Sequence, residues 1–396
     1  MEGQIRHKFL YKLLRFLLRP YLIFRFGYTY DQTNTDDAPY IVLSNHNTDW
    51  DPLLVAMSFK EQMYFVASEH IFRWGMLSRL IIFLVAPIAR VKATADALTV
   101  IDILKALRAG SNVCIFAEGN RSFNGETCTI LPSTGKLVKH CGVALVTYRL
   151  DGGYFTSPRW STTLRRGAMH GQSVNVYSPQ QLSQMSVDEI NLAINKDLYV
   201  NAYIEQAKDP IAYHGKNLAE NLETILYLCP KCLRLSTLKG KGDELTCACG
   251  LRLCYTQFGL LTGTKGETPF STILDWDKWQ IAELKRRLPE FRALPHDVPI
   301  ISDNEQLLYI CKRETTGKLL GVGRLCLYND RIALECSDKC IEFALDQIVN
   351  MATHGQMVLI FSLADNRFFE IKSPYPRSAV LYLMLYRLLK NEKPII

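Results

Sequence analysis

A histidine and an aspartate five residues apart are the first residues that could do chemistry. His46 follows an apolar run at 40–44 that predicts a strand, and Asp51 comes five residues later. An alcohol is a poor nucleophile at neutral pH, and an imidazole that takes its proton during attack overcomes this. A carboxylate on the other ring nitrogen fixes the tautomer. The pattern predicts His46 as a general base oriented by Asp51. Two alternatives stay open: Asp51 merely caps a helix beginning at Pro52, or Asp49 is the partner.

A second polar group follows the apolar run at 112–117, which predicts a buried strand. It contains Glu118, Gly119 and Arg121. Gly119 permits a tight turn, and the planar guanidinium of Arg121 suits a phosphate. The group therefore predicts an anion-binding loop. The alternative is a solvated loop in which Glu118 and Arg121 simply pair.

Four cysteines form a third group with the spacing of metal ligands. They are Cys229, Cys232, Cys247 and Cys249. Two thiolate pairs at this separation predict a structural zinc ribbon. The second pair is C-x-C, so Cys254 is an alternative ligand, and a disulfide between the first two cysteines is an alternative to metal. No histidine lies near the cluster to support a water-activating, catalytic metal.

The two polar groups together resemble the glycerolipid acyltransferase family. Its members carry an N-H-x-x-x-x-D block, here 45–51, and an F-P-E-G-x-R-S block, here 116–122 with Ala117 in place of proline. A third family block, which ends in an arginine, is similar to 86–90 and places Arg90. The fourth block usually contains Val-Pro, and its place at 143–146 lacks the proline. The resemblance covers residues 35–175.

The resemblance implies a complete catalytic assignment. It implies His46 as base, Asp51 as its orienter, and Glu118, Gly119 and Arg121 as ligands of the acceptor's glycerol phosphate, with Arg90 assisting. The implied reaction moves a fatty acyl group from acyl-CoA or acyl carrier protein to a lysophospholipid hydroxyl, foremost 1-acylglycerol-3-phosphate, which becomes phosphatidate in phospholipid biosynthesis. No catalytic cofactor is implied. The alternatives are glycerol-3-phosphate or another lysolipid as acceptor, or a non-catalytic lipid-binding adaptor.

Several elements are needed to position these residues. A length of 396 residues predicts two or three domains. Alternating strand and helix signals up to about residue 180 predict an α/β domain with a mixed sheet flanked by helices. Residues 186–226 and 271–291 read as helical, and a β-rich region capped by a helix at 377–390 resembles a pleckstrin-homology domain. The expected division is an interface helix at 1–30, the acyltransferase domain at 31–226, the zinc ribbon at 227–262, a helical linker at 263–295 and the β-rich domain at 296–396.

The first 30 residues predict contact with an anionic membrane surface. Residues 5–27 read as an amphipathic helix that Pro20 kinks or ends. Six basic residues stand against one acid, Glu2: Arg6, Lys8, Lys12, Arg15, Arg19 and Arg25. Cations beside a broad apolar face are typical of a helix lying in a lipid interface, and an ordinary packed surface helix is the alternative. The longest apolar run, 80–89, is too short to span a bilayer, and no secretory signal is evident.

These features predict a peripheral protein on the cytoplasmic side of a membrane. The net charge of +7 favours anionic partners. The few basic residues of the ribbon are not interleaved with aromatics, so nucleic acid is not expected as a partner.

Overall fold

The computed structural model describes residues 2–35, 37–68, 76–90, 97–263, 268–312, 315–365 and 367–392. The chain forms two compact units. The first comprises the described residues up to Gly215 except Trp160–Thr162, and the second comprises those three and the described residues from Lys216 onward. The first unit therefore ends before residue 226, the boundary expected from the sequence.

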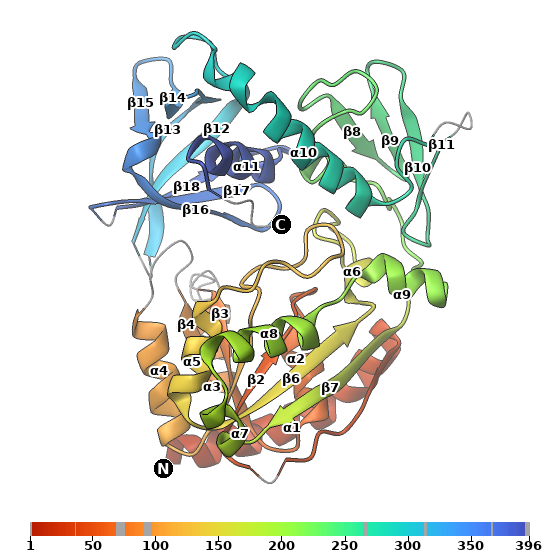
Figure 1. The fold of residues 1–396 in the computed structure, drawn as a ribbon, viewed down its shortest axis with the longest axis vertical. Coiled ribbons are helices and arrows are strands. Elements are labelled where there is room, and N and C mark those ends of the chain that lie inside the picture. The colour runs from red at the N-terminus through yellow and green to blue at the C-terminus, as the bar shows by residue number, and fades with distance from the viewer. Residues whose placement is uncertain are drawn as a thin grey trace. The chain divides into compact units, whose positions relative to one another are not determined.

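The sheet of the first unit is mixed, as the sequence predicts, and it has seven strands (Figure 1). The strand order is β1-β7-β6-β2-β5-β3-β4. All neighbours pair in parallel except β6 and β7, which are antiparallel. The strands are β1 (Tyr28–Tyr30), β2 (Tyr40–Ser44), β3 (Met63–Ser68), β4 (Ile88–Arg90), β5 (Asn112–Phe116), β6 (Ala144–Asp151) and β7 (Met169–Tyr177).

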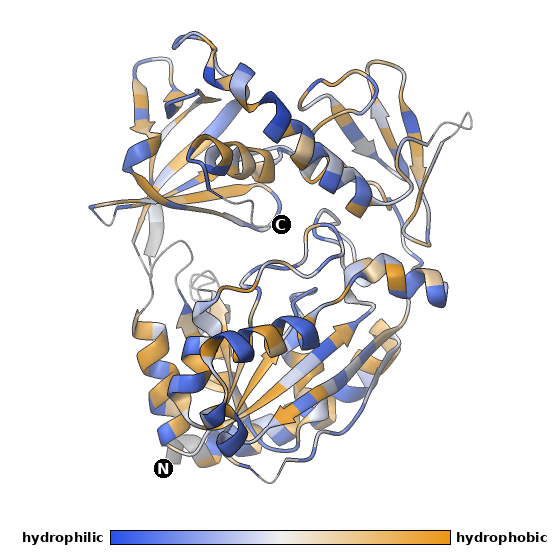
Figure 2. Ribbon diagram, viewed as in Figure 1, coloured by the Kyte–Doolittle hydropathy of each residue, from blue (hydrophilic) through white to orange (hydrophobic). Residues whose placement is uncertain are grey.

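Nine helices are described in the first unit, and helices pack on both faces of its sheet. They are α1 (Glu2–Phe26), α2 (Asp51–Ser58), α3 (Met76–Val85), α4 (Ala97–Arg108), α5 (Ser133–Cys141), α6 (Gly153–Thr156), α7 (Pro179–Gln184), α8 (Val187–Leu198) and α9 (Ala202–Lys208). Successive side chains of β2 point to opposite faces of the sheet and enter two separate hydrophobic cores. Tyr40 and Val42 pack with α1 and α2. Ile41 and Leu43 pack with α4, α5 and α8. Burial on both faces explains why β2 and β5 are largely apolar, apart from Ser44 and Asn112 at their ends (Figure 2).

Helix α1 is packed on the first core along one side only. It continues through Pro20 to Phe26, so the expectation that Pro20 ends the segment is wrong. Tyr11, Leu22 and Phe26 are buried in the core. The opposite side exposes large apolar residues: Ile5, Phe9, Leu13, Phe16, Leu17, Tyr21, Ile23 and Phe24.

The region expected to be helical from 186 to 226 is only partly so. Ser186 and Glu189 form a capping box at the start of α8. The side chain of Asn201 caps a separate helix, α9, which ends at Lys208, two residues before Pro210. Beyond it the described chain is mostly irregular, apart from the short 3₁₀ helix η2 (Leu222–Thr224).

The second unit begins with a small antiparallel sheet and a long helix. The sheet order is β11-β10-β9-β8, from β8 (Leu238–Lys241), β9 (Glu244–Cys247), β10 (Arg252–Tyr255) and β11 (Leu261–Gly263). Helix α10 (Ile273–Arg292) follows, where the sequence predicts a helix. Its Trp276 is buried and donates from Nε1 to the carbonyl oxygen of Leu228, which ties α10 to the segment carrying the first cysteine pair.

The rest of the second unit is a seven-stranded antiparallel sheet with a C-terminal helix. The strand order is β15-β14-β13-β12-β18-β17-β16. The elements are β12 (Ile301–Lys312), β13 (Thr315–Leu327), β14 (Arg331–Glu335), β15 (Cys340–Ala344), the 3₁₀ helix η3 (Leu345–Gln347), β16 (Ile348–His354), β17 (Val358–Leu363), β18 (Phe368–Lys372) and α11 (Ala379–Leu389). The expected β-rich region is confirmed, and its resemblance to a pleckstrin-homology domain stays a prediction.

Candidate active site

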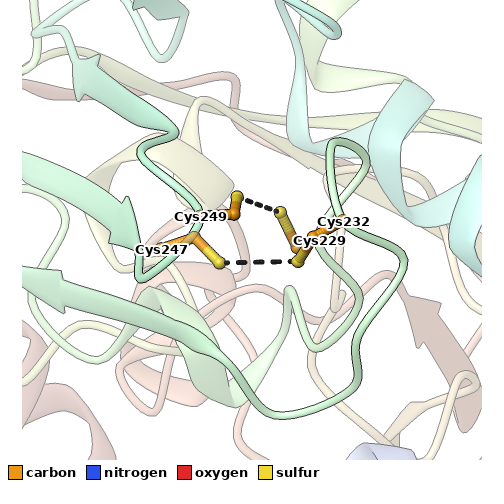
Figure 3. A group of neighbouring side chains, drawn as sticks. All are labelled: Cys229, Cys232, Cys247 and Cys249. Carbon is orange, nitrogen blue, oxygen red and sulfur yellow. Dashed lines mark hydrogen bonds between the residues drawn. The ribbon is translucent and has the colours of Figure 1, made fainter.

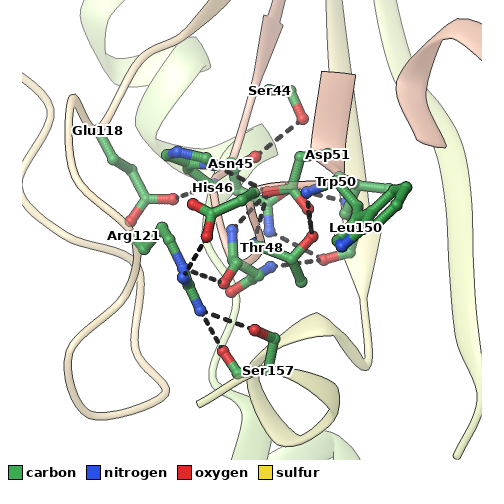
Figure 4. A network of polar contacts seen from close by, with 12 residues as sticks. Ser44, Asn45, His46, Thr48, Trp50, Asp51, Glu118, Arg121, Leu150 and Ser157 are labelled. Atoms are coloured by element: carbon green, nitrogen blue, oxygen red, sulfur yellow. Dashed lines mark hydrogen bonds and ion pairs between the residues drawn. The ribbon is translucent and has the colours of Figure 1, made fainter. Parts of the chain in front are cut away.

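Two adjacent parallel strands bring the two polar groups together. β2 and β5 pair in parallel, and Ser44 at the end of β2 lies opposite Phe116 at the end of β5. Parallel strands that end at the same level send their following loops to the same edge of the sheet. The loop after Ser44 carries His46, and the loop after Phe116 carries Glu118 and Arg121 (Figure 4). The strand pairing thus joins residues that are about 70 positions apart in the sequence.

His46 and Asp51 form the predicted pair. Nδ1 of His46 lies 2.8 Å from Oδ2 of Asp51, and the ring stacks on Phe116 with centroids 4.6 Å apart. An ionised carboxylate only accepts hydrogen bonds, so Nδ1 carries the proton and Nε2 keeps its lone pair. The imidazole is 21% exposed, and Asp51 is fully buried. This geometry suits a general base acting through Nε2.

The two alternatives for the aspartates do not match the structure. The N-cap of α2 is Trp50, which makes no side-chain capping bond, and Asp51 is the first residue of the helix. Asp49 instead forms an ion pair with Arg121 at 3.1 Å. Asp51 is therefore the carboxylate that faces the imidazole.

Asp51 also organises the loop that carries His46. Its Oδ2 accepts from the backbone N–H groups of Asn47 at 2.6 Å and Thr48 at 3.0 Å. Its Oδ1 accepts from the hydroxyl of Thr48 at 2.6 Å. These three hydrogen bonds hold the carboxylate in one orientation. The orienting group is itself held rigidly.

Glu118 is buried beside His46 and does not pair with Arg121. Its Oε1 accepts from the backbone N–H of His46 at 2.7 Å, and its Oε2 accepts from the backbone N–H of Cys128 at 2.5 Å. Burial raises the pKa of Glu118 to about 8, against the two backbone hydrogen bonds, which lower it. The alternative of a solvated loop with a Glu118–Arg121 pair is excluded.

Arg121 uses most of its guanidinium within the protein. Nε donates to the carbonyl oxygen of Asn47 at 2.8 Å. Nη2 donates to the carbonyl oxygen and hydroxyl of Ser157 at 2.5 and 2.9 Å. Nη1 pairs with Asp49, whose side chain is largely exposed. Asp49 is the most exposed of these partners, and the other donors fasten the loop after β5 to the segments that carry Asn47 and Ser157.

Gly119 and Arg90 are in close contact. Gly119 has φ +66°, and a Cβ at this position would lie 3.1 Å from Nη1 of Arg90. Both the left-handed backbone and the close approach favour glycine here. Arg90, at the end of β4, thereby joins the same site as Glu118 and Arg121. The structure brings together all six residues that the sequence assigns to catalysis and acceptor binding.

Two further motif residues have positioning roles that the sequence did not reveal. Asn45 bridges to β6: its Nδ2 donates to the carbonyl oxygen of Leu150 at 2.9 Å, and its Oδ1 accepts from the Leu150 N–H at 2.8 Å. The backbone N–H of Ser122 donates to the carbonyl oxygen of His46 at 3.0 Å. Their presence in the two blocks was the available signal, but their partners depend on the tertiary fold.

The four predicted cysteine ligands converge in the second unit. Their Sγ atoms all lie within 4.8 Å of one another (Figure 3). Sγ of Cys229 is 3.6 Å from that of Cys249, and Sγ of Cys232 is 3.8 Å from that of Cys247. Four thiolates around zinc, each at about 2.3 Å, would be separated by about 3.8 Å. The donor set therefore fits a tetrahedral zinc ion.

The structure also bears on the two alternatives for the cysteines. All four are free cysteines, so a disulfide between Cys229 and Cys232 is not formed. Cys254 is not a member of the convergent group, and its Sγ faces the carbonyl oxygen of Tyr255 at 3.9 Å.

A comparison with protein families finds a match over the segment that contains His46 and Asp51. Residues 28–151 match the family model described as Acyltransferase, a segment that includes all six residues of the site. A comparison with curated proteins finds no match.

Among solved structures, the chain is similar to the 1-acyl-sn-glycerophosphate (LPA) acyltransferase, PlsC, from Thermotoga maritima. The two share 16% identity with a TM-score of 0.42, covering 51% of this chain and 81% of that one. The C-terminal domain of an unknown protein from Leishmania infantum is similar at 9% identity and a TM-score of 0.18, covering 27% of this chain and 96% of that one. Because both TM-scores lie below 0.5, function is inferred from the matched segment and the site geometry.

Proposed function

We propose that this chain is an O-acyltransferase that moves a fatty acyl group from a thioester to a hydroxyl of a lysophospholipid, foremost 1-acylglycerol-3-phosphate. The observation that carries the proposal is the imidazole of His46, oriented through Nδ1 by a buried carboxylate and open at Nε2. The site has no need of its own nucleophile, because the substrate brings the attacking hydroxyl. The matched acyltransferase segment supports the same chemistry.

The reaction follows from the free nitrogen of the base. Nε2 of His46 takes the proton of the acceptor hydroxyl as its oxygen attacks the thioester carbonyl carbon. The tetrahedral intermediate collapses and breaks the carbon–sulfur bond. The imidazolium, stabilised by Asp51, then returns its proton to the departing thiolate. The products are an ester and a free thiol on coenzyme A or acyl carrier protein.

The acceptor's phosphate is assigned to the cations around Gly119. Arg90 contributes positive charge beside Gly119, and Arg121 contributes it two residues further on. Among the described residues, Nη1 of Arg121 pairs with the exposed Asp49. A phosphorylated acceptor therefore fits better than an uncharged one. Glycerol-3-phosphate and other phosphorylated lysolipids share this chemistry and are the nearest alternatives.

The proposed activity predicts thiol release that depends on the acceptor. Incubation with acyl-CoA should release free thiol much faster in the presence of lysophosphatidate than in its absence, with phosphatidate as the product by mass spectrometry. A panel containing glycerol-3-phosphate and lysolipids with other headgroups identifies the acceptor. Hydrolysis of the thioester at one rate with every acceptor, with no esterified product, would rule out the proposal.

We further propose that the protein binds the cytoplasmic surface of a membrane peripherally through α1. The helix exposes a row of apolar residues on the side that does not pack on the core, and Phe16 is 78% exposed. This apolar surface continues onto α3, where Met76 is 85% exposed and Arg6 lies over the ring of Phe83. Among the described residues, no helix combines the length and hydrophobicity needed to cross a bilayer.

The membrane contact predicts salt-sensitive binding to anionic vesicles. Lys8 and Lys12 are exposed on α1, whereas Arg15 donates to the carbonyl oxygen of Met57 and belongs to the packed side. The double variant Lys8→Glu/Lys12→Glu should sediment less with anionic liposomes, because each cation near such a surface contributes about 1 kcal/mol. It should retain activity on a short-chain soluble acceptor.

A matched variant gives the control for this experiment. Lys196→Glu/Lys208→Glu changes the net charge equally at exposed positions on α8 and α9. Equal losses of binding in both double variants would mean that overall charge, and not α1, governs membrane binding.

A further inference from the structure

The main chain of His46 is held on both sides by the loop that follows β5. Its N–H donates to Oε1 of Glu118 at 2.7 Å, and its carbonyl oxygen accepts from the N–H of Ser122 at 3.0 Å. His46 lies in a loop beyond the end of β2, so it has no partners from regular strand pairing. These two hydrogen bonds take the place of strand pairing. They fix the backbone position of His46, from which its side chain extends.

Both oxygens of Glu118 are used by backbone groups. The second oxygen accepts from the N–H of Cys128 at 2.5 Å, so one carboxylate joins the His46 loop to the chain beyond Ser122. Glu118 is only 6% exposed, and Figure 4 shows it beside His46 with its carboxylate turned toward that loop. A buried carboxylate whose two oxygens already accept short bonds is poorly placed to contact a substrate.

The geometry of this position calls for a side chain with two acceptor oxygens. Two backbone N–H donors, from His46 and Cys128, point at Glu118, and a carboxyl group offers one oxygen to each. Burial raises the pKa of Glu118 to about 8, and the hydrogen bonds from these two groups act in the opposite direction by favouring the charged form.

We infer that Glu118 is a positioning residue that fixes the main chain of His46 against Asp51, and not a ligand of the acceptor's glycerol phosphate. The inference rests on the proposed function in that His46 is the base. The block at 116–122 then has two parts. Glu118 and the N–H of Ser122 hold the base, while Gly119 contacts Arg90 and Arg121 presents Nη1 to the acceptor.

The test is the isosteric variant Glu118→Gln, for which kcat and the KM for the acceptor are measured separately. In Glu118→Gln one amide oxygen can accept from one N–H, but the NH₂ group faces the other donor. A small displacement of the base should lower kcat by about 10²-fold, with the KM for lysophosphatidate changed by less than about twofold. The matched control is Glu126→Gln, whose carboxylate accepts from the hydroxyl of Tyr199 at 2.8 Å. It should keep wild-type kinetics.

A spectroscopic measurement reports on the base without requiring activity. In histidine-labelled full-length protein, the Nδ1 proton of His46 bonded to Asp51 should give a slowly exchanging resonance, identified by its absence in His46→Asn. It should shift or broaden in Glu118→Gln and stay unchanged in Glu126→Gln. An unchanged resonance together with a raised acceptor KM and a preserved kcat would overturn the inference and make Glu118 an acceptor ligand.

Hydrogen exchange on the unmodified chain covers the case in which Glu118→Gln does not fold. The amides of His46 and Cys128 should be protected, because both are bonded to Glu118. Exchange of both at the rate of an unstructured peptide would overturn the inference. If the wild type acylates no acceptor while the His46 resonance still responds to Glu118→Gln, the proposed function fails and the positioning role stands.

Discussion

Replacing His46 with alanine should lower the rate of acyl transfer by about 10²–10⁴-fold, the usual contribution of a general base. The change removes Nε2, the ring nitrogen that is open to the acceptor, and leaves Asp51 with its bonds to Asn47 and Thr48. The loop should therefore keep its shape. Thiol release from acyl-CoA with lysophosphatidate measures the rate, and thermal unfolding with circular dichroism measures the fold.

Two further variants show whether the loss comes from the base itself. His46→Asn can still donate a side-chain N–H toward Asp51 but has no basic nitrogen, so it should be as slow as the alanine variant. His170→Ala removes another partly exposed histidine of the first unit, which contacts Thr29 and Asp31, and should keep wild-type turnover. Near wild-type turnover in both His46 variants would exclude the proposed mechanism.

Asp51 offers a less clean test than His46. Four donors meet its carboxylate, three of them from Asn47 and Thr48. An asparagine would turn an NH₂ group toward some of these donors and leave them unpaired in a buried place, at a cost of about 1–3 kcal/mol each. A slow Asp51→Asn enzyme would therefore combine a misoriented imidazole with a loosened loop.

Replacing Cys229 with serine should abolish zinc binding and unfold the ribbon. Cys229 is fully buried, and its Sγ is one corner of the convergent four-thiolate group. Structural zinc sites in small domains contribute about 10–16 kcal/mol of apparent binding free energy, comparable to the whole stability of a domain. Elemental analysis should find about one zinc per wild-type chain and none in the variant, whose thermal midpoint should fall sharply.

The ribbon supplies its own matched control. Cys254 lies on β10, close in sequence to the cluster but outside it, so Cys254→Ser should keep the metal and the thermal midpoint. A strong chelator should reproduce the effect of Cys229→Ser on the wild type. Freshly purified, reduced protein that holds no zinc yet unfolds at the wild-type temperature would contradict the assignment.

Some boundaries of helices and strands can be predicted from neighbouring residues alone, and others cannot. The Ser186–Glu189 capping box marks the start of α8, because the residues that make it are three positions apart. The pairing of β16 (Ile348–His354) with β17 carries a register shift between Ile348 and Asn350, which interrupts regular alternation at the start of this strand. Pro20, expected to kink or end α1, does not end it, and Leu22 and Phe26 beyond it are buried in the core.

The sequence by itself determined which residues can do the chemistry. Residue type and short spacing suffice to predict a base with an orienting acid, and the spacing of the four cysteines predicts a metal site before any fold is known. The tertiary structure decided how the second loop works. The parallel pairing of β2 with β5 brings Glu118 to the backbone of His46 and turns Arg121 toward Asn47 and Ser157. Those partners lie between 36 and 74 positions away in the chain. Nothing local in the sequence selects such contacts, because they follow from which strands lie side by side.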